Sequence, residues 1–252
     1  MNILFSGDRN VKKGIMLSCL SLKNHVKGEV NIYILTATVD KYKAIDESFI
    51  KTLKDKTGFN VFLFDASENF KNALPEKNMG TRFTPLCMLR LFADEFDVPK
   101  KILYLDTDVL CRKDFEDFYN LDISDIELLG VPDRYGSHFF KKDYLNSGVL
   151  LMNMENIKKS GLFKKCRKMC KEKKMFMPDQ TALNKLSIKK VAPRKFNEQG
   201  AIKDDTVFKH FTTFFKFFPY FRAVTIKPWH TEKLHQDLRI FEFDHILEEA
   251  GL

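Results

Sequence analysis

The first third of the chain alternates short apolar runs with amphipathic segments. The apolar runs predict strands over residues 3–5, 30–35 and 60–64. The segments between them repeat their apolar positions at helical spacing and predict helices over residues 12–23 and 41–54. Strands and helices that alternate at such short intervals are typical of βαβ units, so we expect a mainly parallel sheet.

The middle of the chain continues this alternation. We expect a helix over residues 85–96, a buried central strand over 102–105, and further strands over 127–131 and 148–152. A lysine-rich helix is predicted over 156–174, and the pattern becomes irregular toward the carboxyl terminus. Neither an internal repeat nor a Gly/Ser-rich linker divides the 252 residues, so a single α/β domain is expected.

The composition fits a globular protein with an anionic partner. Hydrophobic residues make up 44% of the chain and charged residues 30%, and the formal net charge is +8. That charge suits a sugar nucleotide, an anionic membrane surface or a nucleic acid, and does not distinguish them. The five cysteines show no C-x-x-C spacing and no signal-peptide pattern opens the sequence, so we expect reduced thiols and a cytoplasmic location. No apolar run is long enough to predict a membrane-spanning helix.

Two aspartates, Asp106 and Asp108, stand at the end of the predicted central strand. Ligands of open α/β sheets bind just beyond the carboxyl ends of strands. If the chain stays extended there, both carboxylates point the same way. Two such anions repel each other unless a cation lies between them, and a divalent ion that bridges a diphosphate is the natural occupant. An Asp-rich turn without a metal is the structural alternative, because Asp is common in turns.

The sequence around this pair, residues 103–110 (LYLDTDVL), resembles the D-x-D segment of family 8 of the retaining glycosyltransferases. That family includes glycogenin and bacterial lipopolysaccharide galactosyl- and glucosyltransferases. Further segments resemble the family's motifs in the same order. They are the uridine-binding strand and turn at 3–10 (ILFSGDRN), the helix at 84–91 that ends in Arg90-Leu91, the strand at 144–153 (YLNSGVLLMN), the helix start at 178–184 (PDQTALN) and the Lys-Pro-Trp at 227–229. The resemblance therefore covers nearly the whole chain.

This resemblance implies one GT-A, Rossmann-like domain over residues 1–252, with a mainly parallel central sheet flanked by helices. Residues 1–110 would form a nucleotide-binding half that ends in the D-x-D, and residues 111–252 a half for the donor sugar and the acceptor. The implied reaction moves galactose or glucose from a UDP-hexose to an acceptor hydroxyl with retention of configuration. The implied acceptor is a lipopolysaccharide or another cell-surface glycan or glycolipid.

The resemblance also implies a metal site formed by Asp106, Asp108 and His210. His210 stands in a segment similar to the family's H-F-x-G; on the residues alone, a histidine in an apolar run is a core residue. Two carboxylates and an imidazole suit Mn²⁺ better than Ca²⁺, and Mg²⁺ is the second candidate. The implied enzyme is a metal-dependent hexosyltransferase.

Donor-binding residues are implied by the same motifs. They are Ser6, Asp8, Asn10, Arg90, Asp106, Thr107, Asn146, Ser147 and Lys227. Ser6 would contribute its backbone, while Asp8 and Asn10 would bind uridine or, on the residues alone, cap the helix that follows. Val11 stands where the family usually has an aromatic residue that stacks on uracil, so a nucleotide other than UDP stays open. Arg90 would otherwise be a surface charge, as most arginines are.

Asp179 and Gln180 are the implied catalytic pair. On the residues alone, Pro178 and Asp179 are an ordinary helix start. The resemblance places Asp179 on the sugar hydroxyls and Gln180 beside the anomeric carbon, as a weak nucleophile or as a stabiliser of an oxocarbenium-like transition state. Asp133 would face the acceptor. No Asp or Glu is clearly placed as a covalent nucleophile, which favours same-face attack over double displacement.

One segment departs from the family pattern. Residues 212–226 separate His210 from Lys227, and Thr213 stands where the family has a glycine. The aromatic-rich part of this insertion contains Phe214, Phe215, Phe217, Phe218, Pro219, Tyr220 and Phe221. Either the insertion bulges out and returns Lys227 to the diphosphate, or Lys227 has lost that role. The aromatic side chains would form an exposed flap that faces a membrane or the acceptor, or a hairpin packed on the core.

Other functions stay open on the sequence. The lysine-rich helix is either a solvated face or a peripheral contact with the inner face of a membrane. A sugar-nucleotide nucleotidyltransferase would usually need a Gly-rich phosphate loop, and residues 6–9 contain one glycine. A non-catalytic basic protein that binds membrane or nucleic acid is the other alternative, but no recognised nucleic-acid motif is present, so we expect no nucleic-acid partner. A degenerate, inactive transferase also stays open, because of Val11 and the insertion.

Overall fold

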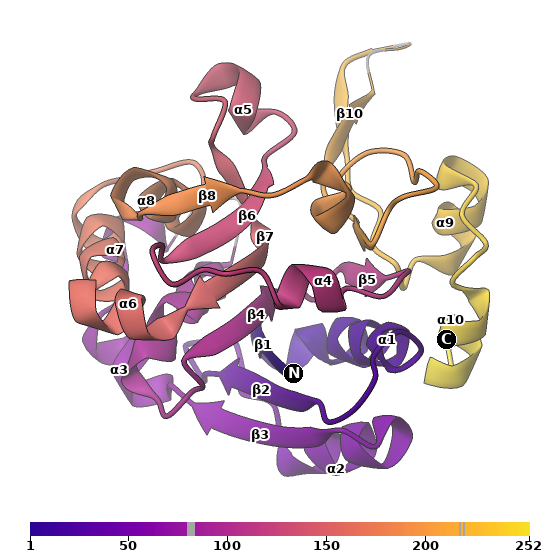
Figure 1. The fold of residues 1–252 in the computed structure, drawn as a ribbon, viewed down its shortest axis with the longest axis horizontal. Helices are drawn as coiled ribbons and strands as arrows, with labels where there is room; N and C mark the ends of the chain where they lie inside the picture. Colours follow the sequence, from indigo (N-terminus) through magenta and orange to yellow (C-terminus); the bar gives the residue numbers. More distant parts are fainter. Residues whose placement is uncertain (80–83, 217, 219) are drawn as a thin grey trace.

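The computed structural model of the chain describes residues 1–79, 84–216, 218 and 220–252, and is built around a seven-stranded sheet (Figure 1). The strands lie side by side in the order β3 (Asn60–Asp65), β2 (Asn31–Thr36), β1 (Asn2–Ser6), β4 (Lys101–Leu105), β7 (Leu145–Asn153), β6 (Leu128–Pro132) and β8 (Lys189–Val191). Every strand predicted from an apolar run is present in this sheet, with small shifts at its ends.

The sheet is mainly parallel, as predicted. β1 pairs in parallel with β2 and β4, β2 with β3, and β6 with β8, whereas β7 pairs antiparallel with both β4 and β6. Because β7 runs against its neighbours, its first residues lie at the same edge of the sheet as the carboxyl ends of β1, β4 and β6. This edge therefore gathers the polar residues that follow or begin these strands.

Apolar strand residues alternate between two cores, one on each face of the sheet. In β1, the side chains of Ile3 and Phe5 enter one core and that of Leu4 enters the other, and all three are fully buried. The helices that cover the first core are α1 (Lys12–Lys23), α2 (Glu47–Thr57) and α10 (Asp244–Ala250). Those that cover the second are α3 (Ser67–Asn72), the 3-10 helix η3 (Pro85–Glu95), α6 (Met154–Ser160), α7 (Leu162–Glu172) and α8 (Pro178–Leu186). Burial on both faces explains why the strands are continuously apolar.

Two predicted helices differ in their start or type. The helix expected over residues 41–54 begins only at Glu47, because Asp46 caps it by accepting a hydrogen bond from the backbone N–H of Phe49 (3.0 Å). The helix expected over residues 85–96 is the 3-10 helix η3. In both cases the local hydrogen bonds, not the apolar pattern, decide the detail.

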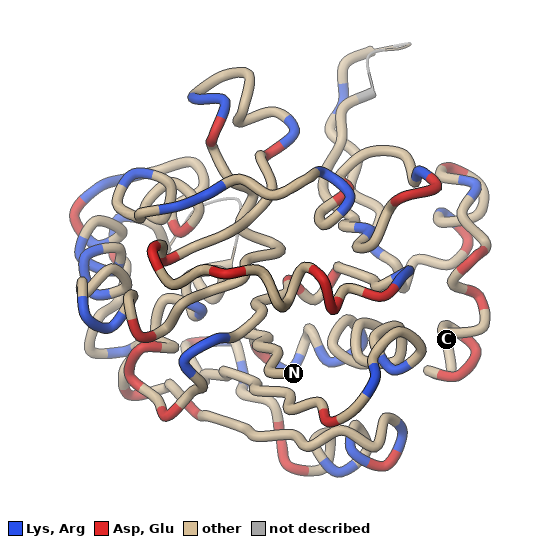
Figure 2. Tube along the Cα trace, in the orientation of Figure 1, with Lys and Arg blue, Asp and Glu red and all other residues tan. Residues whose placement is uncertain are grey.

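The lysine-rich segment expected as one helix over residues 156–174 is two helices, α6 and α7. Gly161 between them has a φ of 68°, a left-handed conformation that ends α6. The buried face of α7 consists of Leu162, Phe163, Cys166 and Cys170. Its lysines are exposed, and basic residues recur along α6 and α7 (Figure 2). In the described part of the chain, no helix combines the length and apolar character needed to cross a membrane.

Two small antiparallel sheets and several short helices complete the fold. β5 (Val109–Cys111) pairs with β9 (Phe208–His210), and β10 (Phe214–Lys216) pairs with β11 (Arg222–Val224). The short helices are η1 (Arg9–Val11), η2 (Glu76–Asn78), α4 (Glu116–Tyr119), α5 (Gly136–Phe139), η4 (Arg194–Asn197) and α9 (Thr231–Leu238).

The insertion at residues 212–226 forms the β10–β11 hairpin, which projects from the body at the same end as the α5 loop (Figure 1). The exposed side chains near its tip are Phe218, Tyr220 and Phe221. At its base the ring of Phe215 packs on that of Tyr135, with 4.9 Å between centroids. Phe217 and Pro219 lie outside the described residues. Of the two predicted arrangements, the structure has the exposed flap, and what the flap faces stays a prediction.

Candidate active site

The two aspartates lie in a tight turn between β4 and β5. The chain does not stay extended after β4: the backbone N–H of Val109 donates to the carbonyl of Asp106 (3.1 Å), which turns the chain at Asp108. β5 then pairs with β9 in a register that sets Val109 opposite His210. The turn and this strand pairing, instead of an extended strand, bring both carboxylates toward the imidazole.

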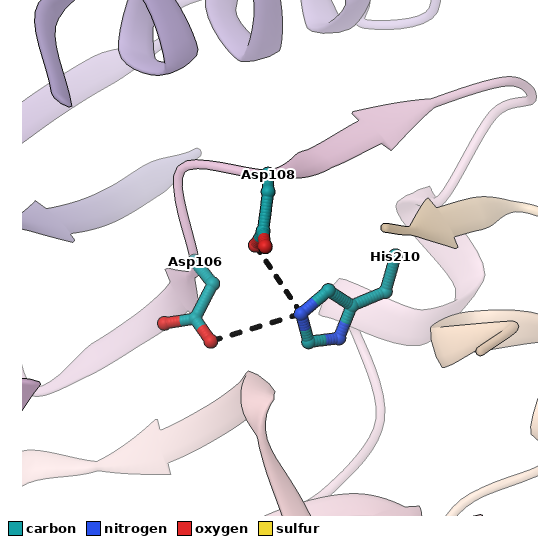
Figure 3. Close-up of side chains that lie close together, drawn as sticks. All are labelled: Asp106, Asp108 and His210. Atoms are coloured by element: carbon teal, nitrogen blue, oxygen red, sulfur yellow. Dashed lines mark ion pairs between the residues drawn. The ribbon is translucent and has the colours of Figure 1, made fainter. Parts of the chain in front are cut away.

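Asp106, Asp108 and His210 form one cluster (Figure 3). Their ligand atoms all lie within 4.8 Å of one another, and His210 Nε2 is 3.2 Å from Asp108 Oδ1 and 3.8 Å from Asp106 Oδ2. Gly148 leaves room for the cluster, because a Cβ there would overlap the imidazole and lie 2.8 Å from Asp106 Oδ2. Two carboxylates and an imidazole at these separations can hold a divalent ion. The predicted ligands are assembled, and the identity of the metal stays a prediction.

A chain of hydrogen bonds fixes which nitrogen of His210 faces the carboxylates. The backbone N–H of Gly148 donates to Asn146 Oδ1 (3.0 Å), which also accepts from Asn197 Nδ2 (3.0 Å). The remaining amide atom, Asn197 Oδ1, then accepts a hydrogen bond from His210 Nδ1 (3.0 Å). The Asn197 contact therefore fixes a proton on Nδ1, and the imidazole turns Nε2, the nitrogen that would ligate a metal, toward the carboxylates.

Asn197, which orients His210, was not predicted from the sequence. It is fully buried at the end of η4, in the irregular part of the chain where no motif marks it. The only feature of the sequence that could have pointed to Asn197 is its residue type, since an amide side chain needs hydrogen-bond partners wherever it is buried. Asn197 acts through its hydrogen bonds to Asn146 and His210 and is a positioning residue.

Arg90 is buried between two acidic residues. Its Nη2 lies 2.9 Å from Asp106 Oδ1 and its Nε lies 3.2 Å from Asp179 Oδ2, while its guanidinium stacks over the ring of Tyr104 (4.2 Å). Its Nη1 donates to the carbonyl of Ser147 (2.5 Å). Burial raises the pKa of Asp179, and the positive charge of Arg90 opposes that rise. Arg90 is therefore not a surface charge; it ties the D-x-D turn to the start of α8.

Lys227 returns to the site at the end of the insertion. Its Nζ forms an ion pair with Asp108 Oδ2 and donates to the carbonyl of Phe211 (3.3 Å). Burial works against the charged form of Asp108, but Lys227 and His210 together outweigh it and hold the pKa of Asp108 well below its usual range. Of the two expected outcomes for the insertion, the structure has the one in which it bulges out and leaves Lys227 at the D-x-D. A contact with a diphosphate stays a prediction.

The side-chain amide of Gln180 is held at both ends. Its Oε1 accepts from the backbone N–H (3.0 Å) and the hydroxyl (3.3 Å) of Ser147. Its Nε2 donates to Asp133 Oδ2 (3.3 Å), which also accepts from Asn146 Nδ2 (2.9 Å). Beside it, Asp179 Oδ2 is buried: its ion pair with Arg90 Nε lacks hydrogen-bond geometry, and this oxygen accepts no hydrogen bond from the described residues. The starts of β7 and α8 are thus joined into one polar floor.

All the predicted site residues except Asn10 line one cavity of about 670 Å³. Asp8 lies in this lining after β1, and caps η1 by accepting from the backbone and side-chain N–H groups of Asn10 (3.3 and 2.6 Å). Asn10 is exposed and does not line the cavity. The structure therefore shows only its contact with Asp8, and its role in uridine binding stays a prediction. The hydroxyl of Ser6 is engaged by that of Tyr104 (3.2 Å). Trp229, to which no stacking role was assigned, supplies an aromatic ring to the lining.

Comparisons with known sequences identify the family. Residues 2–233 match the model of Glycosyl transferase family 8. The lipopolysaccharide 1,2-glucosyltransferase of Escherichia coli is 28% identical over 264 residues, which cover 91% of this chain and 73% of that protein. A putative glycosyltransferase of Haemophilus influenzae is 24% identical over 175 residues, which cover 66% of this chain and 52% of that protein. The chain thus spans about half to three quarters of the length of these relatives.

A solved structure supports the same fold. The crystal structure of an active-site mutant of LgtC matches 100% of this chain and 95% of its own chain, with a TM-score of 0.74 and 21% identity. The fold and its site define a GT-A glycosyltransferase, with a mostly parallel sheet flanked by helices. The chain belongs to glycosyl transferase family 8. The family, the fold and the enzyme class predicted from the sequence are thereby confirmed, while the donor sugar, the metal, the acceptor and the roles of single residues stay predictions.

Proposed function

We propose that the protein transfers a hexose, galactose or glucose, from a UDP-sugar to the hydroxyl of an acceptor glycan with retention of the anomeric configuration. The observation that carries this proposal is that the cluster of Asp106, Asp108 and His210 lines the same cavity as Asp179 and Gln180. A cation site for a diphosphate is thereby contiguous with a polar floor for a sugar. Family membership supports a nucleotide-sugar donor and a glycan acceptor; UDP and hexose are the proposed choices.

Asp106, Asp108 and His210 would hold the metal, which we take to be Mn²⁺, with Mg²⁺ as the alternative. The mixed nitrogen and carboxylate set fits Mn²⁺. Asn197 supports this assignment, because its contact with His210 Nδ1 directs Nε2 toward the carboxylates as the nitrogen that would ligate the metal. When bound, the ion would neutralise negative charge on the diphosphate leaving group.

Two basic residues, Lys227 and Arg90, would have separate electrostatic roles beside the metal. Lys227, held beside the D-x-D by its ion pair with Asp108, would be a second positive charge at the diphosphate. Arg90 is engaged by both Asp106 and Asp179, so it would hold these carboxylates in place for the donor. Its contact with the carbonyl of Ser147 extends that support to the start of β7.

The uridine would bind beyond β1, near Asp8. Val11 cannot stack on uracil as an aromatic residue would, and Trp229 offers a ring in its place. Trp229 packs on α1 one turn beyond Val11, where a Cβ on Gly14 would lie 2.9 Å from its indole. Both side chains line the cavity. We therefore assign uracil stacking to Trp229.

Gln180 would stabilise the transition state instead of acting as a nucleophile. Its Oε1 accepts two hydrogen bonds from Ser147, so both lone pairs of that oxygen are engaged. An attacking oxygen needs a free lone pair, whereas a fixed dipole can still face positive charge that develops on the anomeric carbon. This supports same-face attack, in which the acceptor hydroxyl enters as the diphosphate leaves.

The two halves of the chain would each bind one part of the donor. Residues 1–110 supply Asp8, Arg90 and the D-x-D, and we assign nucleotide binding to them. Residues 111–252 supply the starts of β7 and α8, and we assign the donor sugar and the acceptor to them. Because one cavity draws on both halves, neither is expected to bind the donor alone.

The acceptor would be a lipopolysaccharide or another cell-surface glycan, as the name of the Escherichia coli relative suggests. We further propose that the protein makes a peripheral contact with the inner face of a membrane. The exposed lysines of α7 and the exposed aromatic side chains of the β10–β11 hairpin support this contact. Basic and aromatic side chains together are typical of proteins that bind at the surface of an anionic bilayer.

Hydrolysis of a panel of UDP- and other nucleotide-sugars tests the proposed reaction. With Mn²⁺, the wild type should release hexose from a UDP-hexose, and EDTA should stop the release. Asp108→Asn removes a charged ligand at nearly constant size, and should lower the rate by about a hundredfold or more. The control is Asp117→Asn, which makes the same change at an exposed position of α4 and should leave the rate unchanged.

Two results would contradict the proposed reaction. If no nucleotide-sugar is hydrolysed, and calorimetry detects no Mn²⁺-dependent binding of any of them, the chain is a degenerate transferase or a binding module. If UTP and a hexose 1-phosphate instead yield UDP-hexose and pyrophosphate, the protein is a nucleotidyltransferase.

A further inference from the structure

A second cavity adjoins the donor cavity. It has a volume of about 580 Å³, and Asp133, Tyr135 and Gln199 line both cavities. Gln199 holds the backbone on both sides of Asp133. Its Oε1 accepts from the backbone N–H of Arg134 (2.8 Å), and its Nε2 donates to the carbonyl of Pro132 (3.0 Å). The other polar side chains of its lining include Arg134, His138 and Arg194. None of these basic side chains has a role in the reaction proposed above.

Two guanidinium groups converge beside this cavity, at Gly200. A Cβ on Gly200 would lie 2.7 Å from Arg194 Nη2 and 3.2 Å from Arg134 Nη1. Arginines from two distant segments of the chain therefore direct their charged ends to one point. Like charges this close repel each other unless an anion lies beside them.

The protein itself neutralises part of this positive charge. Glu198 is almost fully buried, and its Oε1 accepts from Arg194 Nη2 (2.7 Å) and from the backbone N–H of Gly200 (2.6 Å). Lys209 lies beside them and its Nζ donates to the carbonyl of Gly200 (2.5 Å), but burial lowers the pKa of Lys209 to about 8 and so weakens its charge. Within the described ranges of the chain, no carboxylate lies at ion-pair distance from Arg134. Two guanidinium groups and the weakened charge of Lys209 thus surround one ion-paired carboxylate.

Asp133, the other acid of the lining, is occupied elsewhere. Its Oδ1 accepts from the backbone N–H groups of Tyr135 (3.0 Å) and Gly136 (2.6 Å). Its Oδ2 accepts from Asn146 and Gln180 on the floor of the donor cavity. Asp133 therefore does not pair with Arg134 or Arg194, and both exposed guanidinium groups are available to a ligand.

We propose that the second cavity binds a phosphate group carried by the acceptor. This inference rests on the proposed glycosyl transfer and names the chemistry of its acceptor. A phosphate group matches the positive charge that Glu198 leaves uncompensated, and guanidinium groups bind phosphate oxygens through paired N–H donors. The wall shared with the donor cavity would then place an acceptor hydroxyl beside Asp133. This phosphate site is separate from the diphosphate site proposed at Asp108 and Lys227.

A titration with inorganic phosphate tests the site without turnover. In the ¹⁵N-labelled full chain, phosphate should shift the amide resonances of Arg134 and Gly200 and saturate in the millimolar range. Arg134→Gln should weaken this binding by about fivefold or more, because a hydrogen bond to a charged group is lost. Lys142→Gln is the matched control: it removes the same charge from an exposed position of the same loop, lines neither cavity, and should leave the binding unchanged.

The fold of the variant is checked by its melting temperature, which should stay near that of the wild type because Arg134 is exposed. Phosphate shifts that are confined to residues 106–108, or that are identical in Arg134→Gln, would overturn the proposed site. The first result would mean that phosphate binds at the D-x-D, and the second that it binds without Arg134.

A matched pair of acceptors tests what the site is for. With a UDP-hexose and Mn²⁺, the KM for a phosphorylated methyl hexoside should be about tenfold lower than for the same hexoside without phosphate, at similar kcat. Arg134→Gln should remove this difference, and Lys142→Gln should keep it. Equal KM values in the wild type would leave a site for free phosphate and overturn its role in acceptor binding. If neither hexoside is an acceptor, the phosphate titration decides; absence of donor hydrolysis in the wild type would count against the proposed transfer itself.

Discussion

Two regions of the donor cavity are built in opposite ways. The floor consists of the D-x-D turn and the starts of β7 and α8, and most of its polar side chains are buried and hydrogen-bonded to one another. The rim consists of the α5 loop and the β10–β11 hairpin, which project at the same end of the molecule (Figure 1). The tips of both expose aromatic side chains. A floor of this kind is preorganised, whereas an exposed rim can change without loss of stability. A chain built in this way can keep its chemistry fixed in the floor, and we expect the rim to select the acceptor.

Removal of Arg90 should have the largest effect on the floor. Arg90→Met keeps much of the side-chain volume but leaves Asp179 and Asp106 without their shared cation. We expect the free energy of unfolding, measured by urea denaturation, to fall by about 3–5 kcal/mol. In the control Arg112→Met, the lost ion pair with Glu242 is more exposed, so the cost should be about 1 kcal/mol or less. If both variants lost the same free energy of unfolding, the buried ion pairs of Arg90 would stabilise the fold no more than an exposed pair does.

A methyl group at Gly148 should damage the ligand cluster itself. The added Cβ would overlap the imidazole of His210, which must move away from the carboxylates. We expect the Mn²⁺ affinity of Gly148→Ala, measured by EPR titration, to fall by about a hundredfold. Gly161→Ala is the control, because its Cβ meets open space and its left-handed backbone should cost only about 1 kcal/mol of stability. Unchanged Mn²⁺ affinity in Gly148→Ala would mean that the metal binds elsewhere.

Loss of the Asn197 side chain should have a smaller effect, because it acts through His210. Asn197→Ala removes the acceptor for His210 Nδ1, so the proton is free to move to Nε2. We expect the Mn²⁺ affinity to fall by about 10–100-fold, and the ¹⁵N resonances of the imidazole to report the change of tautomer. Asn69→Ala, which breaks an exposed hydrogen bond to Glu95, should change neither. An unaltered tautomer in Asn197→Ala would contradict the positioning role.

Those parts of the floor that lie on or next to strands and helices could be predicted from the sequence. Asp106 ends an apolar strand and Gly148 lies in another, so periodicity and motif both mark their neighbourhoods. The turn at Asp106 and Asp108 was predicted only as the alternative to an extended strand. The sequence does not decide between them, because the turn leads into the pairing of β5 with β9, two segments far apart in the sequence. Asn197 was missed for a similar reason: its partners come from other segments, and η4 has no periodicity of its own.

The rim could not be predicted beyond its composition. The aromatic residues at 212–226 are visible in the sequence, but their count favours a packed hairpin and an exposed flap equally. The outcome depends on whether neighbouring segments offer an apolar surface. In the structure Phe215 finds Tyr135, while the tip beyond it projects away from the core. Such tertiary neighbours are not encoded in a local pattern.

The same substitution at two phenylalanines compares the stability contributed near the floor with that contributed by the rim. Phe208 in β9 is fully buried beside the ligand cluster, whereas Phe218 near the tip of the hairpin is 88% exposed. Phe208→Ala should lower the free energy of unfolding by about 3–5 kcal/mol. Phe218→Ala should change it by about 0.5 kcal/mol or less, the smallest effect of the series.

The hairpin variant also separates the two proposed partners of the rim. If the tip inserts into a bilayer, Phe218→Ala should weaken binding to anionic phospholipid vesicles, measured by sedimentation, by about tenfold, because the burial of one aromatic side chain is lost. Lys142→Gln, which removes one charge from the neighbouring loop, should weaken it by about fivefold or less, since a charge near an anionic surface contributes about 1 kcal/mol. Vesicle binding that survives in Phe218→Ala, together with a raised KM for the acceptor, would instead assign the hairpin to the glycan. In that case the rim would hold the acceptor through aromatic contacts at the tip and basic contacts at Arg134, and the membrane contact would be left to the lysines of α7.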